Sequence, residues 1–141
     1  MKSFLFLAPV LFMRTMLSDG TLTVTILNFR NNLGQVSVAL YNKEEAFPKS
    51  PDKTVKIKYA PIQDKKAVIV FESLPPGEYA ISVFHDENKN GKMDSNFFGI
   101  PKEGVGASND ARGHLGPPHY KDAKFNFKGG IQSISISLVY L

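Results

Sequence analysis

The sequence predicts an all-β fold, an antiparallel seven-stranded β-sandwich with one long capping loop. Apolar and polar residues alternate with a period of two in seven short segments, which is typical of strands with one buried face. Clusters of Pro, Gly and Asn separate these segments, and none has the pattern of a long helix. The length of 141 residues suits one domain with a self-sufficient apolar core.

The strands are expected in a fixed order along the chain. In TLTVTILNF (21–29) aliphatic residues alternate with threonines, and GQVSVALYN (34–42) repeats the pattern. Asn and Gly between them favour a turn, so these two segments are predicted to pair as a hairpin. The Gly129-Gly130 pair predicts another hairpin near the C-terminus. The other five expected strands are 54–60, 66–74, 77–86, 123–129 and 132–141.

The segment FESLPPGEYAISVFHD (71–86) contains the sharpest predicted reversal of the chain. Two prolines fix φ angles, Gly77 tolerates positive φ, and alternation then points Tyr79, Ile81 and Val83 to one face. This turn and strand resemble those of prealbumin-like sandwich modules, such as the regulatory domains that follow some carboxypeptidases. The inward-facing residues of the strands are expected to form the core: Val24, Ile26, Val38, Leu40, Val68, Val70, Ile81, Val83, Ile134 and Ile136.

Residues 1–20 differ in kind from residues 21–141, which are predicted to form the single β-sandwich domain. Lys2 is followed by SFLFLAPVLFM, an apolar run of signal-peptide length that is short for a membrane-spanning helix. We therefore expect a signal peptide or an N-terminal anchor, and a periplasmic or secreted protein. Arg14 interrupts the segment and no small-x-small cleavage pattern follows, so an uncleaved anchor and a mis-assigned start are alternatives. Membrane contact would then occur only through this segment.

Composition excludes several classes of function. The chain has no cysteine, which excludes disulfides, a thiolate nucleophile and a thiolate zinc site. The formal charge of +4 includes no long basic run, so no nucleic-acid partner is expected. No phosphate-binding glycine loop, nucleophile elbow or zinc-protease motif occurs. We therefore expect no enzyme and name no catalytic residue.

The segment FHDENKNGKMD (84–94) places oxygen-bearing side chains at regular spacing around Gly91. Counted from the first Asp, these residues occupy positions one, three, five and nine of an EF-hand-type calcium loop, with glycine at six. Position twelve is Phe97 instead of Glu, so modest affinity for Ca²⁺ is expected. The alternative is a polar turn whose side chains bond only their own backbone. The predicted metal ligands are Asp86, Asn88, Asn90 and Asp94, and Glu87, Glu103, Asn109 or Asp110 could add oxygens.

A connection of nearly thirty residues, SNFFGIPKEGVGASNDARGHLGPPHYKD (95–122), follows this loop. Loops of this length are usually functional or disordered, and its apolar residues predict a compact cap on the sandwich. If the cap folds back over the strand end, three histidines and one carboxylate could converge in an arrangement suited to a transition metal or to acid–base chemistry. These residues are His85, Asp86, His114 and His119. Arg112 is expected to clamp the cap through Asp110 or Asp122.

The order of these segments resembles a bacterial family of exported proteins, domain-of-unknown-function family 2141, from about Thr21 to the C-terminus. The most specific parts are HDENKNGKMDSNFFGIPKEG (85–104) and ASNDARG (107–113) followed by GPP (116–118). The resemblance implies a small secreted or periplasmic sandwich of the immunoglobulin/prealbumin-like class. Because the family has no established activity, it implies no catalytic residue.

The predicted function is that of a non-catalytic binding or structural module with a calcium loop at 86–97. Its partner would be a protein, a glycan or a small ligand at the loop face. The alternative is a metal-dependent enzyme or transition-metal carrier that uses His85, His114 and His119.

We expect the protein to be found outside the cytoplasm, because Lys2 and the apolar run after it have the form of an export signal. Fractionation of the producing cells and N-terminal sequencing of the isolated protein measure this. A soluble cytoplasmic protein that still begins at Met1 would contradict the prediction.

Overall fold

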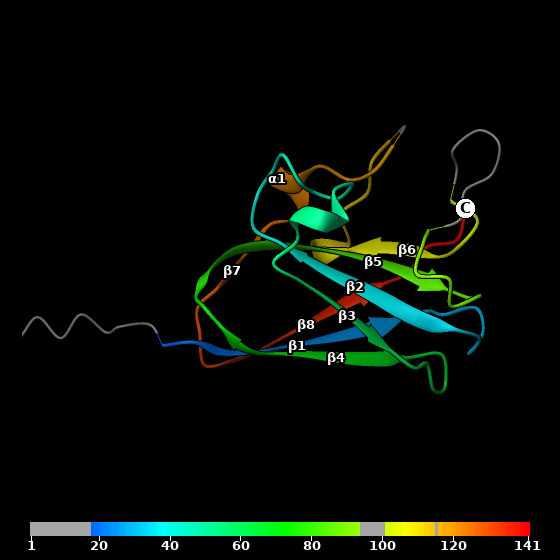
Figure 1. The fold of residues 1–141 in the computed structure, drawn as a ribbon, viewed down its shortest axis with the longest axis horizontal. Helices are drawn as coiled ribbons and strands as arrows, with labels where there is room; N and C mark the ends of the chain where they lie inside the picture. Colours follow the sequence, from blue (N-terminus) through cyan, green and yellow to red (C-terminus); the bar gives the residue numbers. More distant parts are fainter. Residues whose placement is uncertain (1–17, 94–100, 115) are drawn as a thin grey trace, which may run out of the picture.

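The computed structural model describes residues 18–93, 101–114 and 116–141, which form a sandwich of two β-sheets (Figure 1). Residues 1–17 of the expected signal peptide or anchor lie outside these ranges. Within them, no helix is long and apolar enough to cross a membrane. The strands are β1 Gly20–Leu27, β2 Gln35–Tyr41, β3 Lys56–Ala60, β4 Ala67–Leu74, β5 Gly77–Asp86, β6 Val105–Ala107, β7 Phe125–Phe127 and β8 Ile131–Ser137. The short helices are η1 Pro51–Lys53, η2 Ser108–Asp110 and α1 Tyr120–Ala123.

The sandwich class is confirmed, whereas both predicted hairpins are wrong. One sheet has the order β4-β1-β8, and the other has the order β3-β2-β5-β6 with β7 also paired to β5. β1 and β2 therefore belong to opposite sheets, and so do β7 and β8. The turn residues do reverse the chain, since Gly129 and Gly130 both have positive φ, but each reversal crosses between the sheets. The β1–β8 pair is also parallel, and β6 adds an eighth strand within the predicted cap.

The main core lies between the two sheets and contains most of the predicted residues. Val24, Ile26, Val38, Leu40, Ile81, Val83 and Ile136 are buried, and Ile134 packs against them partly buried. The prediction for β4 is wrong, because Val68 is 56% exposed and Val70 is only partly buried and lies outside the core. Ala67, Ile69 and Phe71 face inward instead. This strand is apolar on both faces, so alternation does not identify its inner face. The register with β1, which places Val24 opposite Ile69, decides it.

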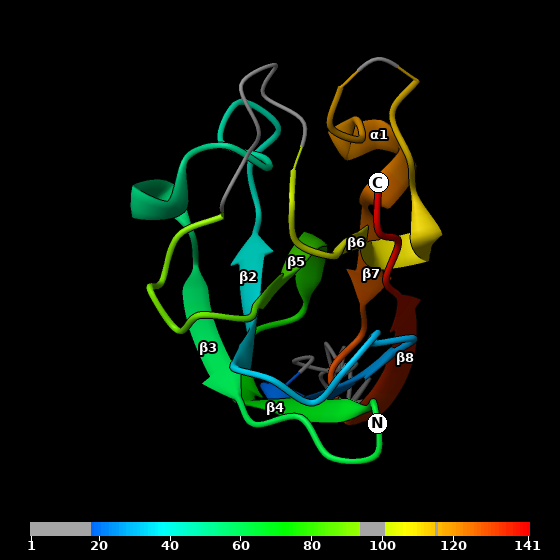
Figure 2. The same ribbon diagram turned by 90° about the vertical axis from the view of Figure 1, so that its right-hand side faces the viewer.

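A second apolar cluster covers the outer face of the β3-β2-β5-β6 sheet, as the segment after β2 and the cap fold over it (Figures 1 and 2). Ser108 fastens the cap to β5, since its hydroxyl accepts the N–H of Ile81 at 2.9 Å and donates to the carbonyl of Ala123 at 2.5 Å. The predicted cap therefore exists and is packed. The cluster contains Tyr41, Ala46, Phe47, Ala80, Ala107, Tyr120 and Ala123.

Two further polar side chains hold the cap, and neither is Arg112. The side-chain amide of Asn109 donates to the carbonyls of Asp122 and Lys124, at 3.2 and 2.9 Å. The carboxylate of Asp110 accepts a backbone N–H of β8 at 2.9 Å. Arg112 is exposed and pairs with no described residue, so the predicted arginine clamp is wrong. The ASNDARG motif instead fastens the cap through hydrogen bonds to backbone groups.

Replacing Ile81 with Ala should lower the free energy of unfolding by roughly 2 to 5 kcal/mol, because the fully buried side chain leaves a cavity. Val68→Ala, at an exposed position of β4, is the matched control and should change the free energy of unfolding by about 0.5 kcal/mol or less. Urea unfolding measures both. Equal effects of the two substitutions would contradict the observed faces of the strands.

Candidate functional site

The loop after β5 is organised around the carboxylate of Asp86, the last residue of the strand. This side chain is fully buried. Its oxygens accept the N–H of Asn90 at 3.1 Å, the N–H of Gly91 at 2.9 Å and the side-chain amide of Gln35 at 3.0 Å. A buried carboxylate is costly unless donors compensate its charge, and these three provide that compensation. Backbone and side-chain donors therefore wrap the loop around the Asp86 carboxylate.

The two asparagines of the loop are exposed, and their oxygens point in different directions. Oδ1 of Asn88 lies 3.3 Å from the N–H of Asn90, the same group that approaches Asp86. One side-chain oxygen of Asp86 and one of Asn88 therefore both lie within hydrogen-bond distance of the same N–H. Oδ1 of Asn90 instead accepts the N–H of Lys92 at 2.9 Å. Asp94, the fourth predicted ligand, lies outside the described residues, as does Phe97.

Gly91 permits the curl of this loop. Its φ is +74°, in the left-handed region that side chains with a Cβ rarely adopt. A Cβ at this position would meet no atom within 4 Å, so backbone conformation and not space requires glycine. The spacing of the motif thus produces a hydrogen-bonded polar turn, and in this turn the oxygens of two predicted ligands approach the same backbone N–H.

Among the additional predicted oxygen ligands outside the loop, Glu103 is the one that contacts the loop. It is buried, and its carboxylate accepts the N–H of Glu87 at 2.7 Å. The side chain of Glu87 pairs with Arg30. Asn109 and Asp110 hold the cap to α1 and β8, as described above, and are not part of this loop. The sequence did not distinguish Glu103 from Asn109 and Asp110, because the positions of these three residues depend on how the cap folds.

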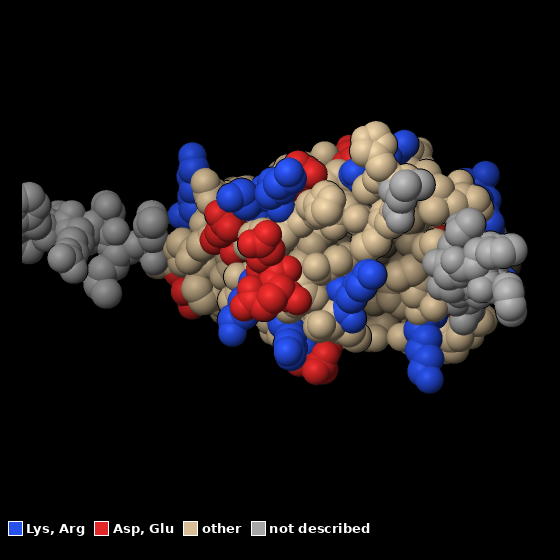
Figure 3. Space-filling view, turned by 90° about the horizontal axis from the view of Figure 1, so that it is seen from above, with Lys and Arg blue, Asp and Glu red and all other residues tan. Residues whose placement is uncertain are grey.

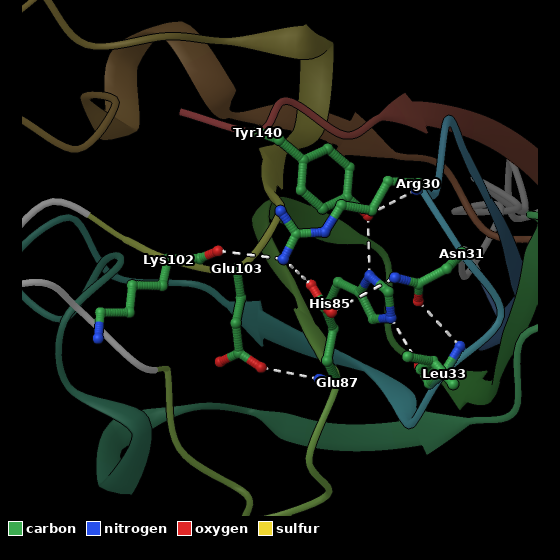
Figure 4. Close-up of polar contacts among 8 residues, drawn as sticks. All are labelled: Arg30, Asn31, Leu33, His85, Glu87, Lys102, Glu103 and Tyr140. Carbon is green, nitrogen blue, oxygen red and sulfur yellow. Dashed lines mark hydrogen bonds and ion pairs between the residues drawn. The ribbon is translucent and has the colours of Figure 1, made fainter.

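His85 is fully buried beside the loop, and both of its ring nitrogens have partners (Figure 4). Nε2 lies 2.6 Å from the carbonyl of Leu33, and Nδ1 lies 2.8 Å from the hydroxyl of Tyr140. A carbonyl can only accept, so in the neutral imidazole Nε2 carries the proton and Nδ1 accepts from the tyrosine. Binding a metal through either nitrogen would break one of these bonds.

Arg30 completes this network on its outer side (Figure 4). Its backbone N–H donates to the hydroxyl of Tyr140 at 3.1 Å, and its guanidinium lies 4.7 Å from the centre of the same ring. The guanidinium also forms an ion pair with Glu87. Burial raises the pKa of Tyr140 above its ordinary value, and the arginine opposes this rise in part. Arg30 and Tyr140 were not predicted, because nothing in either segment signals that the two meet.

These contacts join four separate segments into what we call the strand-end face: the 30–33 turn, the 86–93 loop, residues 102–104 and the C-terminal 139–141. The N–H of His85 donates to the carbonyl of Gly104 at 2.8 Å, and a bridge joins Val105 to Val139. A Cβ at Gly104 would lie 2.5 Å from the ring of Tyr140, so this close approach requires glycine.

The three histidines do not form a metal site. His114 and His119 are exposed in the cap, whereas His85 is buried and has both nitrogens engaged. Across the three ranges of chain that are described, no three His, Cys, Asp or Glu side chains are placed to hold one ion. The predicted convergence is therefore wrong. The cap is fastened over the outer face of the sheet, and this leaves its histidines in solvent.

Comparison with known proteins adds one relation. A family model described as an uncharacterized protein conserved in bacteria, DUF2141, matches residues 24–135, which confirms the predicted resemblance. Searches of curated proteins and of solved structures gave no significant match. The prealbumin-like relation of the sandwich therefore stays a prediction.

Tyr140→Phe should lower the free energy of unfolding by about 1 to 3 kcal/mol, because it leaves Nδ1 of buried His85 without a donor. Tyr59→Phe removes the same hydroxyl from a half-exposed ring and should have little effect. Chemical denaturation compares the two variants. If both cost the same, the His85–Tyr140 bond does not contribute to stability.

Proposed function

This chain belongs to the bacterial DUF2141 family, and we propose that it is a non-catalytic β-sandwich module of the periplasm or the cell exterior. In this proposal the 86–93 loop, together with Asp94, binds a calcium ion. The ion stiffens the strand-end face, which then presents a fixed surface to a protein, glycan or small ligand.

The observation that carries the proposal is the approach of the Asp86 and Asn88 oxygens to one backbone N–H, that of Asn90. Calcium requires several oxygen ligands at about 2.3 to 2.6 Å, so its ligands must already be near one another. Magnesium would demand stricter octahedral geometry, and transition metals favour imidazole or thiolate. The engaged nitrogens of His85 support an oxygen site in preference to a histidine site.

The position of the loop supports a structural role for the ion. Asp86 lies between His85, which bonds to Leu33 and Tyr140, and Glu87, which pairs with Arg30. An ion on Asp86 would therefore stabilise the junction from which the strand-end face is built. Loops held on a rigid scaffold are common binding surfaces.

The distribution of charge supports a partner other than a polyanion. On the capped face, acidic side chains lie among basic ones, and no broad basic surface is visible there (Figure 3). Nucleic-acid-binding domains usually have such a surface. The capped face therefore gives no support for a polyanionic partner.

Calcium should raise the melting temperature of the protein. Calcium at ten times its dissociation constant adds about 1.4 kcal/mol of stability if it binds only the folded state. For a domain of this size that corresponds to a rise on the order of 5 °C. Thermal melts with millimolar calcium and with chelator measure the shift, and magnesium tests selectivity.

Three variants make this experiment specific to the loop. Asp86→Asn and Asp94→Asn remove one charge each and should abolish the calcium-dependent shift. Asp64→Asn, in an exposed turn between β3 and β4, is the matched control and should keep it. An unchanged wild-type midpoint would favour the self-bonded polar turn. A shift that persists in both loop variants would place the ion elsewhere.

A further inference from the structure

The edge strand β3 has an inverted pattern, with lysines on its inner side. In the register with β2, Lys58 lies opposite Val38, which is fully buried in the core. Residues opposite each other on neighbouring strands share a face, so Lys58 points between the two sheets. Ile57 and Tyr59 lie on the outer side, where Tyr59 is 48% exposed.

Lys58 reaches across the open side of the sandwich to β4. Its ammonium donates to the carbonyl of Val70 at 2.5 Å and lies 5.6 Å from the centre of the Phe71 ring. β3 and β4 are the edge strands of opposite sheets, and they approach each other on this side (Figure 2). A shallow groove between them is lined by Lys58, Tyr59, Ala60, Val68, Ile69, Val70 and Glu72.

The free edge of β4 has the properties of a pairing surface. Because the carbonyl of Val70 faces away from β1, the backbone groups of Val68, two residues earlier in the regular part of the register, face the same way. The register with β1 shifts beyond Phe71. No charged side chain occurs from Ala67 to Phe71, and Val68 is exposed. Uncharged, β-branched edge strands pair readily with other strands unless a device such as an inward-pointing charge prevents it.

We propose that the edge of β4 is a self-association surface for a second copy of this chain, and that Lys58 holds it closed. A strand added to β4 would have to break the bond between Lys58 and Val70 and bury the ammonium. This inference is independent of the calcium proposal.

A second copy suits this edge because β4 is complementary to itself. In an antiparallel twofold pairing centred on Val70, Glu72 of one copy lies opposite Val68 of the other, so like charges do not meet. Stable interfaces bury roughly 1,200 to 2,000 Å², and an eight-residue edge offers less. The free-energy difference between the closed and the paired edge is therefore small enough for one lysine to determine which state predominates.

Lys58→Met should strengthen self-association by about tenfold or more, because the charge-assisted hydrogen bond no longer opposes pairing. Sedimentation equilibrium over a range of protein concentrations measures this. Lys58→Arg keeps the charge and should behave as the wild type. Lys56→Met is the matched control. Lys56 lies on the same side of β3, opposite Leu40, but its side chain is exposed and does not form the bond to β4 that Lys58 forms, so its loss should change nothing.

Val68→Pro in the Lys58→Met background locates the surface. The N–H of Val68 faces the free edge, so proline there blocks pairing without removing a bond to β1. It should restore wild-type behaviour. The proposal is overturned if Lys58→Met associates no more tightly than Lys56→Met, or if its association survives Val68→Pro. Circular dichroism checks folding, and Lys58→Gln replaces the methionine variant if that variant does not fold.

Discussion

The burial of two adjacent polar side chains at the end of β5 is the constraint on which the strand-end face depends. His85 and Asp86 are fully buried, and an unsatisfied buried polar group costs about 1 to 3 kcal/mol. His85 obtains its partners from Leu33 and Tyr140, and Asp86 obtains its partners from Gln35 and the loop itself. Satisfying these two side chains positions the 30–33 turn, the loop and the end of the chain together.

The same constraint explains why the loop has two compatible interpretations. The donors that compensate Asp86 curl the chain, and the curl brings the oxygen of Asn88 toward that carboxylate. The proposed cation site would therefore use the same backbone as the hydrogen-bonded turn. In both interpretations His85 has a structural role, because its ring nitrogens form hydrogen bonds with Leu33 and Tyr140.

The two sides of the sandwich where the edge strands lie are protected in different ways. η2 and the cap cover one side, where Asp110 accepts a backbone N–H of β8. The opposite side stays open between β3 and β4, and Lys58 crosses it. An open sandwich must protect its edges, because unpaired backbone groups invite pairing with other chains. The packed cap protects the edges on the first side, and the charge of Lys58 protects them on the second.

The sequence by itself determined seven of the eight strands, all except β6, and it determined which residues of β1, β2 and β5 face the core. Each of these strands has one face rich in large aliphatic side chains, so the alternation identifies it. The loop motif was likewise recognisable, since Asp, Asn and Gly at that spacing form a polar turn. For β4 the alternation was uninformative, because both faces are apolar, and on β3 it was inverted. Only the tertiary structure decided the strand neighbours, the fate of the histidines and the meeting of Arg30 with Tyr140, 110 residues apart. Local patterns report which side of a strand is apolar, whereas these features depend on contacts between segments distant in the chain.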